Sequence, residues 1–402
     1  MHIAKPQDIA YLAFEGGGGK GVTYVGALKA LEELGVLPID IEKPGKNQIK
    51  GISGGSSGAI VSLLVAMGIR STDLEEILTN SATFNGFFDG PLMGQSRMVN
   101  RQNQPDQKVN PSPNLSPEMS ILPPVFILLI KRGLFGQKNS AIVKKLYTYP
   151  EGYLHNLLYD RGLFPGFAMR TFLSNKIDLF LRQKLADIEG NVTGANLGFD
   201  LFYKMTGVDL VVTGSNLTKH RPGVFSRRHT PKFPVAEAVG LSSSYPVFKP
   251  VYVEADVPVG GPNARADDYH GFWADGGLSN NFPLHAFDYL QPPVSTNYPS
   301  LRPLHPKMLG LRLTEGPPGR IQSSSEKIVT FSMIRRHAGD LISTMLYPSE
   351  SGQIRSPEEE EQTIDLFTYD LETLEFAPSL EKRKVPIDAA ADAVHSYFRA
   401  KK

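Results

Sequence analysis

Hydrophobic and polar positions follow two different periods in the first seventy residues, and each period predicts a different element. A mostly apolar run over 9–14 leads through Glu15 into four glycines, which is typical of a buried strand entering a tight loop. Apolar positions at 24, 27, 28 and 31 then follow helical spacing, so a helix is expected over 21–34. A second strand at 48–52 precedes another helical pattern, which Gly68 closes.

This repetition of strand, turn and helix favours an α/β fold. Later short apolar runs predict further strands at 208–214, 224–226, 251–253, 271–274 and 308–313. Alternation of this kind predicts a mostly parallel central sheet flanked by helices, with functional loops at the carboxyl ends of the strands.

The pattern breaks down between residues 93 and 165, where Asn, Pro and Gln interrupt every apolar face. We expect 93–165 to be an inserted cap or lid region within one large domain that spans 1–320. Its one apolar run, 121–130 followed by basic residues, fits either a buried cap helix or a segment that dips into a bilayer.

The last part of the chain, 321–402, is expected to be a mostly helical C-terminal extension packed on the core. It holds a run of four glutamates, so 350–362 is expected to be a solvated loop. Residues 389–400 have the pattern of an amphipathic helix.

Composition excludes several classes of function. The 402 residues include 42 Lys and Arg against 41 Asp and Glu, a formal net charge of +1, so no global field would draw the protein onto nucleic acid. The absence of cysteine excludes a disulfide framework, a thiolate nucleophile and a cysteine-ligated metal. Because the sequence has no signal-peptide pattern and no run of about 18 apolar residues, a cytoplasmic protein is the expectation.

The strongest chemical signal is the G-x-S-x-G motif over 54–58, between a predicted strand and a predicted helix. A serine on such a strained turn projects its hydroxyl above the sheet, and the following helix aims its N-terminal amides at the reacting centre. An overlapping match over 51–55 would make Ser53 the nucleophile. The apolar helix begins directly after Ser56, so the sequence favours Ser56 and leaves Ser53 as a turn residue.

The glycine run over 16–21 is open to three interpretations. A dinucleotide site needs an acidic residue at a strand end about 20 residues later, and Asp40 falls there in a stretch with little strand character. A P-loop needs Ser or Thr after its Gly-Lys, but Gly21 follows Lys20. An oxyanion hole needs glycines so that backbone N–H groups can approach a negatively charged oxygen. Lys20 would either add positive potential or be a solvated side chain at the helix start.

A third motif, Asp275 followed by two glycines, ends the predicted strand at 271–274 and is by itself a good turn. In this order the three motifs resemble the patatin-like phospholipase family, whose pattern is G-G-G-x-[KR]-G, G-x-S-x-G and D-G-[GA]. The segments 238–250 and 278–283 are also similar to that family. The likeness covers 9–70 and 205–315 well, 160–185 loosely, and the insertion and the last eighty residues poorly.

The resemblance implies a lipid acyl hydrolase of the phospholipase A or lysophospholipase type. Ser56 would be the nucleophile, Asp275 its sole base, and Gly16, Gly17, Gly18 and Gly19 the oxyanion hole, with no cofactor and no metal. An acyl-enzyme would form, and water would release the fatty acid from it. The implied partner is a phospholipid or another acyl lipid rather than nucleic acid, which implies a location peripheral at membranes. The family also includes secreted bacterial effectors that wait for a host activator, which leaves open an activating protein and secretion without a signal peptide.

Two other functions remain to be separated from this one. His285, ten residues beyond Asp275, could complete a Ser-His-Asp triad, although it falls inside an expected helix. A nucleotide-binding or regulatory protein could use the glycine loop for phosphate, with Ser56 as a helix cap. The pocket walls that would select the acyl chain, the head group and the glycerol position are expected in the insertion.

Overall fold

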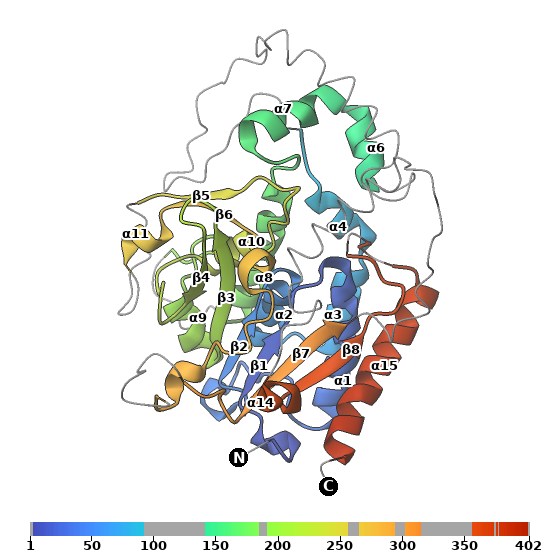
Figure 1. The fold of residues 1–402 in the computed structure, drawn as a ribbon, viewed down its shortest axis with the longest axis vertical. Helices are drawn as coiled ribbons and strands as arrows, with labels where there is room; N and C mark the ends of the chain where they lie inside the picture. Colours follow the sequence, from blue (N-terminus) through green and yellow to red (C-terminus); the bar gives the residue numbers. More distant parts are fainter. Residues whose placement is uncertain are drawn as a thin grey trace.

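The computed structural model describes residues 3–91, 141–184, 191–255, 265–293, 302–314, 356–373, 375–376 and 378–400. A central sheet runs through the described part and is flanked by helices (Figure 1). Its strands are β1 (Tyr11–Phe14), β2 (Gly51–Gly54), β3 (Asp209–Asn216), β4 (Arg221–Ser226), β5 (Val251–Val253), β6 (Gly271–Ala274), β7 (Met308–Thr314) and β8 (Thr363–Phe367).

The helices follow the strands closely in the first third of the chain and cluster later. They are α1 (Tyr24–Glu33), α2 (Ser57–Ala66), α3 (Ser71–Thr79), α4 (Ser81–Phe87), α6 (Ala141–Thr148), α7 (Pro150–Asp160), α8 (Phe167–Lys184), α9 (Phe199–Thr206), α10 (Val235–Ser242), α11 (Ala266–Tyr269), α12 (Gly277–Asn280), α14 (Pro357–Glu361) and α15 (Leu380–Arg399). The helix expected over 21–34 begins instead as a 3-10 turn, Gly18–Thr23, and continues as α1.

The strand order is β5-β6-β3-β2-β1-β7-β8, with β4 also paired to β3. The pairs from β3 through β2, β1 and β7 to β8 are all parallel. The pairs β3 with β4, β3 with β6, and β5 with β6 are antiparallel. This confirms the mostly parallel α/β sheet expected from the sequence.

The two faces of the sheet are covered differently because side chains alternate along each strand. Leu12, Ile52 and Leu210 point into the large core that the helices α1, α2, α10 and α15 share. Ala13 and Val211, one position along, point to the other face, where they pack against Leu284 and Phe287. The segment that follows α12 therefore lies across the face opposite the main helical layer.

The C-terminal residues complete both the sheet and the helical layer. β8 pairs with β7 in parallel, an edge strand that the expected mostly helical extension did not include. α15 packs along α1, and a Cβ on Gly26 would overlap the Ile387 carbonyl oxygen, so the two backbones are in close contact. α15 begins at Leu380, nine residues before the expected start at 389. The four glutamates lie in the short helix α14 rather than in a loop, with Ser356 as its N-cap.

The expected insertion is described only from residue 141 onward, as α6 and α7. The apolar run at 121–130 and its basic neighbours lie outside the described residues. None of the helices in the described ranges is both long and apolar enough to cross a membrane.

Candidate active site

Ser56 occupies the turn between β2 and α2 with φ of +50° and ψ of −129°. A non-glycine residue rarely adopts this conformation, and strain of this kind is typical of a nucleophile that projects from a strand-to-helix turn. The turn needs glycines around it: a Cβ on Gly54 would overlap the Gly58 backbone, and a Cβ on Gly58 would overlap the Phe14 carbonyl oxygen. The G-x-S-x-G spacing is therefore a packing requirement of this turn.

Two serines at the end of α10 hold the Ser56 backbone in place. The Ser56 N–H donates to Ser242 Oγ at 3.0 Å, and Ser243 Oγ donates to the Ser56 carbonyl oxygen at 3.0 Å. In the sequence, these serines are only part of a stretch that resembles the family. Nothing local to 238–250 shows that they clamp a residue 186 positions away.

Ser53, the alternative nucleophile, has a different environment. It is a fully buried residue of β2 rather than a turn residue, and its Oγ donates to the Pro283 carbonyl oxygen at 2.9 Å. A hydroxyl held in this way fixes β2 to the segment beyond α12.

The side chain of Asp275 meets that of Ser56 directly. Ser56 Oγ donates to Asp275 Oδ2 at 2.8 Å, and the Gly277 N–H donates to Asp275 Oδ1 at 2.7 Å. Asp275 is only 1% exposed, and its burial raises the pKa of the carboxyl to about 7, although the hydrogen bonds from Gly277 and Ser56 act in the opposite direction. A carboxyl that titrates near neutrality is suited to general base catalysis.

The strand β6 delivers Asp275 to this point. It is antiparallel to β3 but pairs only with the last two residues of that strand, through Ala274 with Ser215 and Trp273 with Asn216. The chain therefore turns away as soon as it reaches the end of β3, and Asp275 stays beside the carboxyl ends of the parallel strands. Ser215 Oγ donates to the Asp275 carbonyl oxygen at 2.8 Å, which fixes the residue further.

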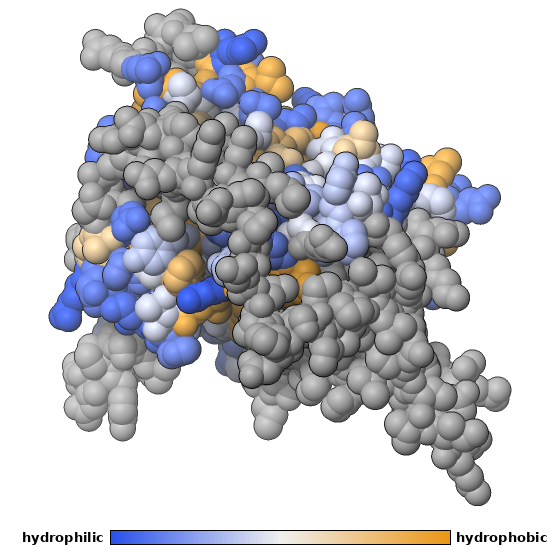
Figure 2. Space-filling model, turned by 90° about the horizontal axis from the view of Figure 1, so that it is seen from above, coloured by the Kyte–Doolittle hydropathy of each residue, from blue (hydrophilic) through white to orange (hydrophobic). Residues whose placement is uncertain are grey.

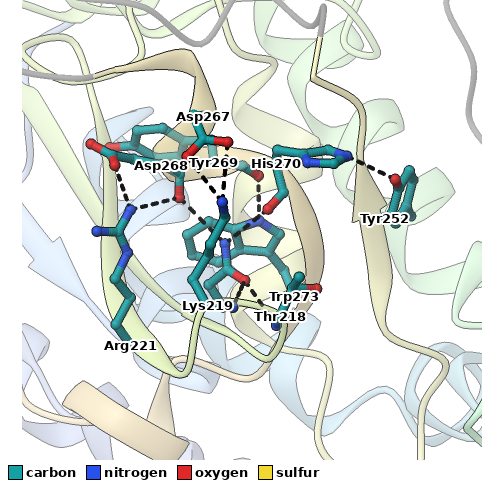
Figure 3. Close-up of polar contacts among 10 residues, drawn as sticks. Thr218, Lys219, Arg221, Tyr252, Asp267, Asp268, Tyr269, His270 and Trp273 are labelled. Carbon is teal, nitrogen blue, oxygen red and sulfur yellow. Dashed lines mark hydrogen bonds and ion pairs between the residues drawn. The ribbon is translucent and has the colours of Figure 1, made fainter.

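A polar network secures the start of β6 against the β3–β4 hairpin (Figure 3). Trp273 Nε1 donates to the Tyr269 carbonyl oxygen at 2.7 Å. Two exposed ion pairs join the hairpin to α11: Lys219 Nζ lies 3.0 Å from Asp267 Oδ2, and Arg221 reaches Asp268 at 2.6 Å. These contacts fix β6 to the β3–β4 hairpin, so Asp275 directly follows a strand that is held in position rather than lying in a free loop.

The glycine loop over 16–19 lies beside the dyad, and its N–H groups have different partners. The Gly16 N–H donates to the Asn281 carbonyl oxygen at 3.1 Å, the Gly17 N–H to Ser57 Oγ at 2.8 Å, and the Gly19 N–H to the Thr373 carbonyl oxygen at 2.8 Å. The Gly18 N–H makes no hydrogen bond with another described residue. Gly18 has φ of +57°, which favours glycine.

Lys20 differs from one of its two expected roles. It is buried, with 4% of its surface exposed, so it is not a solvated side chain at a helix start. Asp40 also lacks the position that a dinucleotide site requires, because its Oδ1 accepts the N–H groups of Glu42 and Lys43 in a turn and no strand ends there.

A cavity opens beside Ser56 and the glycine loop. Ser56, Gly18 and Tyr245 are among its lining residues, and most of the wall is apolar. The apolar side chains include Leu78, Phe84, Phe87, Phe88, Met169, Phe248 and Phe376.

His285 is not available to form a triad with Ser56. Its Nδ1 lies 2.5 Å from Asp288 Oδ2 and its Nε2 lies 2.6 Å from Glu359 Oε1, so both ring nitrogens are engaged. The expected helix around His285 is a turn. The hydrogen bond from Ser56 to Asp275 is direct, with no histidine between them.

Comparison with known families adds to this geometry. The model for patatin-like phospholipases matches residues 12–288. The chain belongs to the patatin-like phospholipase family. Membership places this patatin-like chain among lipid hydrolases, and the matched residues include the glycine loop, Ser56 and Asp275. The match ends before β7, so the cavity residues Thr373 and Phe376 lie outside it.

Among solved structures, VipD from Legionella pneumophila is similar to this patatin-like chain at 18% identity and a TM-score of 0.47, covering 98% of this chain and 67% of VipD. The type III effector ExoU gives 13% identity and a TM-score of 0.40, covering 98% of this chain and 53% of ExoU. ExoU in complex with SpcU from Pseudomonas aeruginosa gives 17% identity and a TM-score of 0.39, covering 99% of this chain and 53% of that ExoU chain. The chain thus spans about half the length of the ExoU chains. No curated protein matches the sequence.

Proposed function

We propose that this protein hydrolyses carboxylic ester bonds of phospholipids or other acyl lipids, as a phospholipase A or lysophospholipase, through a dyad of Ser56 and Asp275. The observation that carries the proposal is the 2.8 Å hydrogen bond from Ser56 Oγ to Asp275 Oδ2, beside a mostly apolar cavity that Ser56 lines. A carboxylate whose pKa lies near neutral pH can accept the proton of a hydroxyl that is hydrogen-bonded to it, which activates the hydroxyl oxygen as a nucleophile.

In the proposed reaction, Asp275 accepts the Ser56 proton as Oγ bonds to the ester carbonyl carbon. The tetrahedral intermediate then collapses, and the leaving alcohol takes the proton from Asp275. Water attacks the acyl-enzyme while Asp275 accepts a proton from it, and the fatty acid leaves as Ser56 recovers its hydrogen. These steps use no cofactor and no metal.

The glycine loop formed by Gly16, Gly17, Gly18 and Gly19 would stabilise the oxyanion. Its Gly18 N–H is the donor that is not engaged by another described residue, and Gly18 belongs to the cavity wall beside Ser56. Removing one oxyanion donor in comparable sites costs about 3–4 kcal/mol of transition-state stabilisation. A substitution that moves the Gly18 N–H away from the oxyanion should therefore impair catalysis nearly as much as loss of the dyad.

Contact with a lipid surface is proposed at the end of the molecule that carries α6 and α7. Lys145 of α6 donates to the Asn85 carbonyl oxygen at 2.7 Å, which ties α6 to the segment that lines the cavity. Tyr149, which directly precedes α7, is 59% exposed, and Tyr159 within α7 is 55% exposed. Seen from this end, the described hydrophobic residues form small separate patches among hydrophilic ones (Figure 2).

We further propose that 1–320 is the hydrolase domain, with 93–165 as its cap, and that 321–402 is an extension that completes the fold.

The direct test of function incubates the pure protein with mixed phospholipid vesicles and identifies the products by mass. Free fatty acid and lysolipid should appear with wild type, and Ser56→Ala and Asp275→Asn should each lower the rate by at least about 10³-fold.

A fluorophosphonate label distinguishes the nucleophile. Wild type and Ser53→Ala should be labelled covalently, whereas Ser56→Ala should not. Equal hydrolysis by wild type and Ser56→Ala would refute the dyad. Saturable nucleotide binding by a protein that takes no label would instead favour the phosphate-binding alternative. Activity only after a second protein is added would indicate the activating partner that the family resemblance leaves open.

A further inference from the structure

The cavity receives part of its wall from a segment far outside the family match. This post-β8 segment, described at 371–373 and 375–376, lies against the glycine loop. The Gly19 N–H donates to the Thr373 carbonyl oxygen at 2.8 Å. A Cβ on Gly18 would overlap that same oxygen, and a Cβ on Gly19 would overlap the Glu375 carbonyl oxygen. The two backbones are therefore packed as closely as glycine allows.

The post-β8 segment is held at both ends. Leu371, just after β8, is buried in the main core. Glu375 forms an ion pair with Lys382 in the first turn of α15, which itself packs along α1. A segment fixed by a strand, a helix and a backbone hydrogen bond presents its side chains in a defined position.

Phe376 is the side chain that this segment contributes to the aromatic part of the cavity. Its ring is stacked on Phe84, with 5.4 Å between centroids and 8° between planes, and lies 5.5 Å from Phe88. Phe88 is in turn stacked on Phe248 at 5.3 Å. All four rings line the cavity. Phe376 therefore joins the wall formed by α4 to the wall formed by the chain before β5.

We propose that Phe376 is a specificity-determining residue, which limits the length of the acyl chain that the cavity accepts. This inference rests on the proposed function, because it assumes that the cavity holds the acyl group of the substrate. Each additional methylene that becomes buried is worth about fourfold in binding, equivalent to about 0.8 kcal/mol. Replacing the ring with a methyl group would open room for further methylenes between Phe84 and Phe88.

The experiment compares kcat/KM for 4-nitrophenyl esters from four to sixteen carbons in wild type, Phe376→Ala and Phe376→Leu. In Phe376→Ala the preferred chain should lengthen by two or more carbons, and the ratio of long-chain to short-chain kcat/KM should rise at least about tenfold. Phe376→Leu should give an intermediate profile. Phe367→Ala is the matched control, since Phe367 ends β8, is 37% exposed and does not line the cavity. Its profile should equal that of wild type.

The outcomes separate this inference from the proposed function. An active wild type with the same profile in Phe376→Ala would overturn the role of Phe376 and leave the hydrolase intact. A uniform rise at every chain length would also overturn it, because the segment would then act as a plug. If wild type hydrolyses no ester, the proposed function fails, and displacement of a fluorescent fatty acid by acids of 8–18 carbons tests Phe376 alone. No chain-length shift in that assay would overturn the inference. Phe376→Leu serves for both assays if Phe376→Ala does not fold.

Discussion

The Asn281 side-chain amide donates a hydrogen bond to the Gly16 carbonyl oxygen at 2.9 Å, and the Gly16 N–H returns one to the Asn281 carbonyl oxygen at 3.1 Å. Asn281 follows α12, six residues after Asp275, and Gly16 opens the glycine loop. This reciprocal pair joins two loops that are 265 residues apart in the chain. The loop that carries Asp275 and the loop that would bind the oxyanion therefore cannot move independently.

Asn281→Ala should impair turnover more than substrate binding. It leaves a buried Gly16 carbonyl oxygen without its partner, which costs about 1–3 kcal/mol of folding stability. With the glycine loop released, kcat should fall by about 10–100-fold while KM changes little. Steady-state kinetics and urea unfolding measure the two effects. Asn280→Ala is the matched control, since the Asn280 side chain makes no hydrogen bond with another described residue. Equal kinetics in the two variants would contradict the proposed role of the Asn281–Gly16 hydrogen bonds.

The rate should depend on pH through Asp275. Its pKa is raised to about 7, chiefly by burial, and only the deprotonated carboxylate can accept the Ser56 proton. The value of kcat/KM should therefore be level above pH 7 and fall about tenfold per pH unit well below it. A profile measured from pH 5 to 9, with enzyme stability checked at each pH, tests this. A rate that stays constant down to pH 5 would exclude Asp275 as the base.

His285 should stabilise the fold in a pH-dependent way. Its hydrogen bonds, first to Asp288 and also to Glu359, raise the pKa of the imidazole to about 9 against the opposing effect of desolvation. The folded protein thus holds this proton more tightly than the unfolded chain, whose histidine has a pKa of about 6.5. The stabilisation is complete below pH 6.5 and is lost as the pH rises through 9.

Urea unfolding of wild type and His285→Gln at pH 6, 8 and 10 measures this contribution. The difference in unfolding free energy should be largest at pH 6, smaller at pH 8 and nearly absent at pH 10. An NMR titration of the His285 ring gives the pKa independently. A difference that grows with pH would show that the ion pairs to Asp288 and Glu359 do not control the charge.

Gly26→Ala should loosen α15 from the helical layer. The added Cβ would overlap the Ile387 carbonyl oxygen, and backbone cannot move aside as a flexible side chain can. Overpacking of this kind costs about 1–3 kcal/mol. Gly86→Ala is the matched control, because Gly86 also lies in a helix but has open space at its Cβ position, so it should be neutral or slightly stabilising. Thermal melts compare the variants, and equal stability would mean that α15 can shift without cost.

The parts of the fold that local pattern determines were predictable. The bounds expected for β5 and β6 are those observed, and the helix expected after Ser56 is α2. β8 was missed although its burial alternates, with Ile364 and Leu366 inward. The run of glutamates just before it indicates a solvated loop, and only pairing with β7 makes the following five residues a strand.

The site divides in the same way. Ser56 was selected from local chemistry, since a strained turn needs small residues on either side of it. Asp275 was selected only through the resemblance to patatin-like phospholipases, because its glycine pair is by itself a common turn. The contact between Gly19 and Thr373 leaves no trace in neighbouring residues, because it joins backbone atoms of segments that are 354 residues apart. The burial of Lys20 and the second hydrogen bond of His285, to Glu359, are also set by distant segments.

The last forty residues supply an edge strand, the helix against α1 and an aromatic ring in the cavity. In a chain cut after β7, the side of β7 that pairs with β8 would have no hydrogen-bond partners, and the apolar side of α1 that α15 covers would be open to water. Exposed strand edges pair readily with other chains. A shortened form of this protein would therefore tend to aggregate instead of persisting as a smaller enzyme.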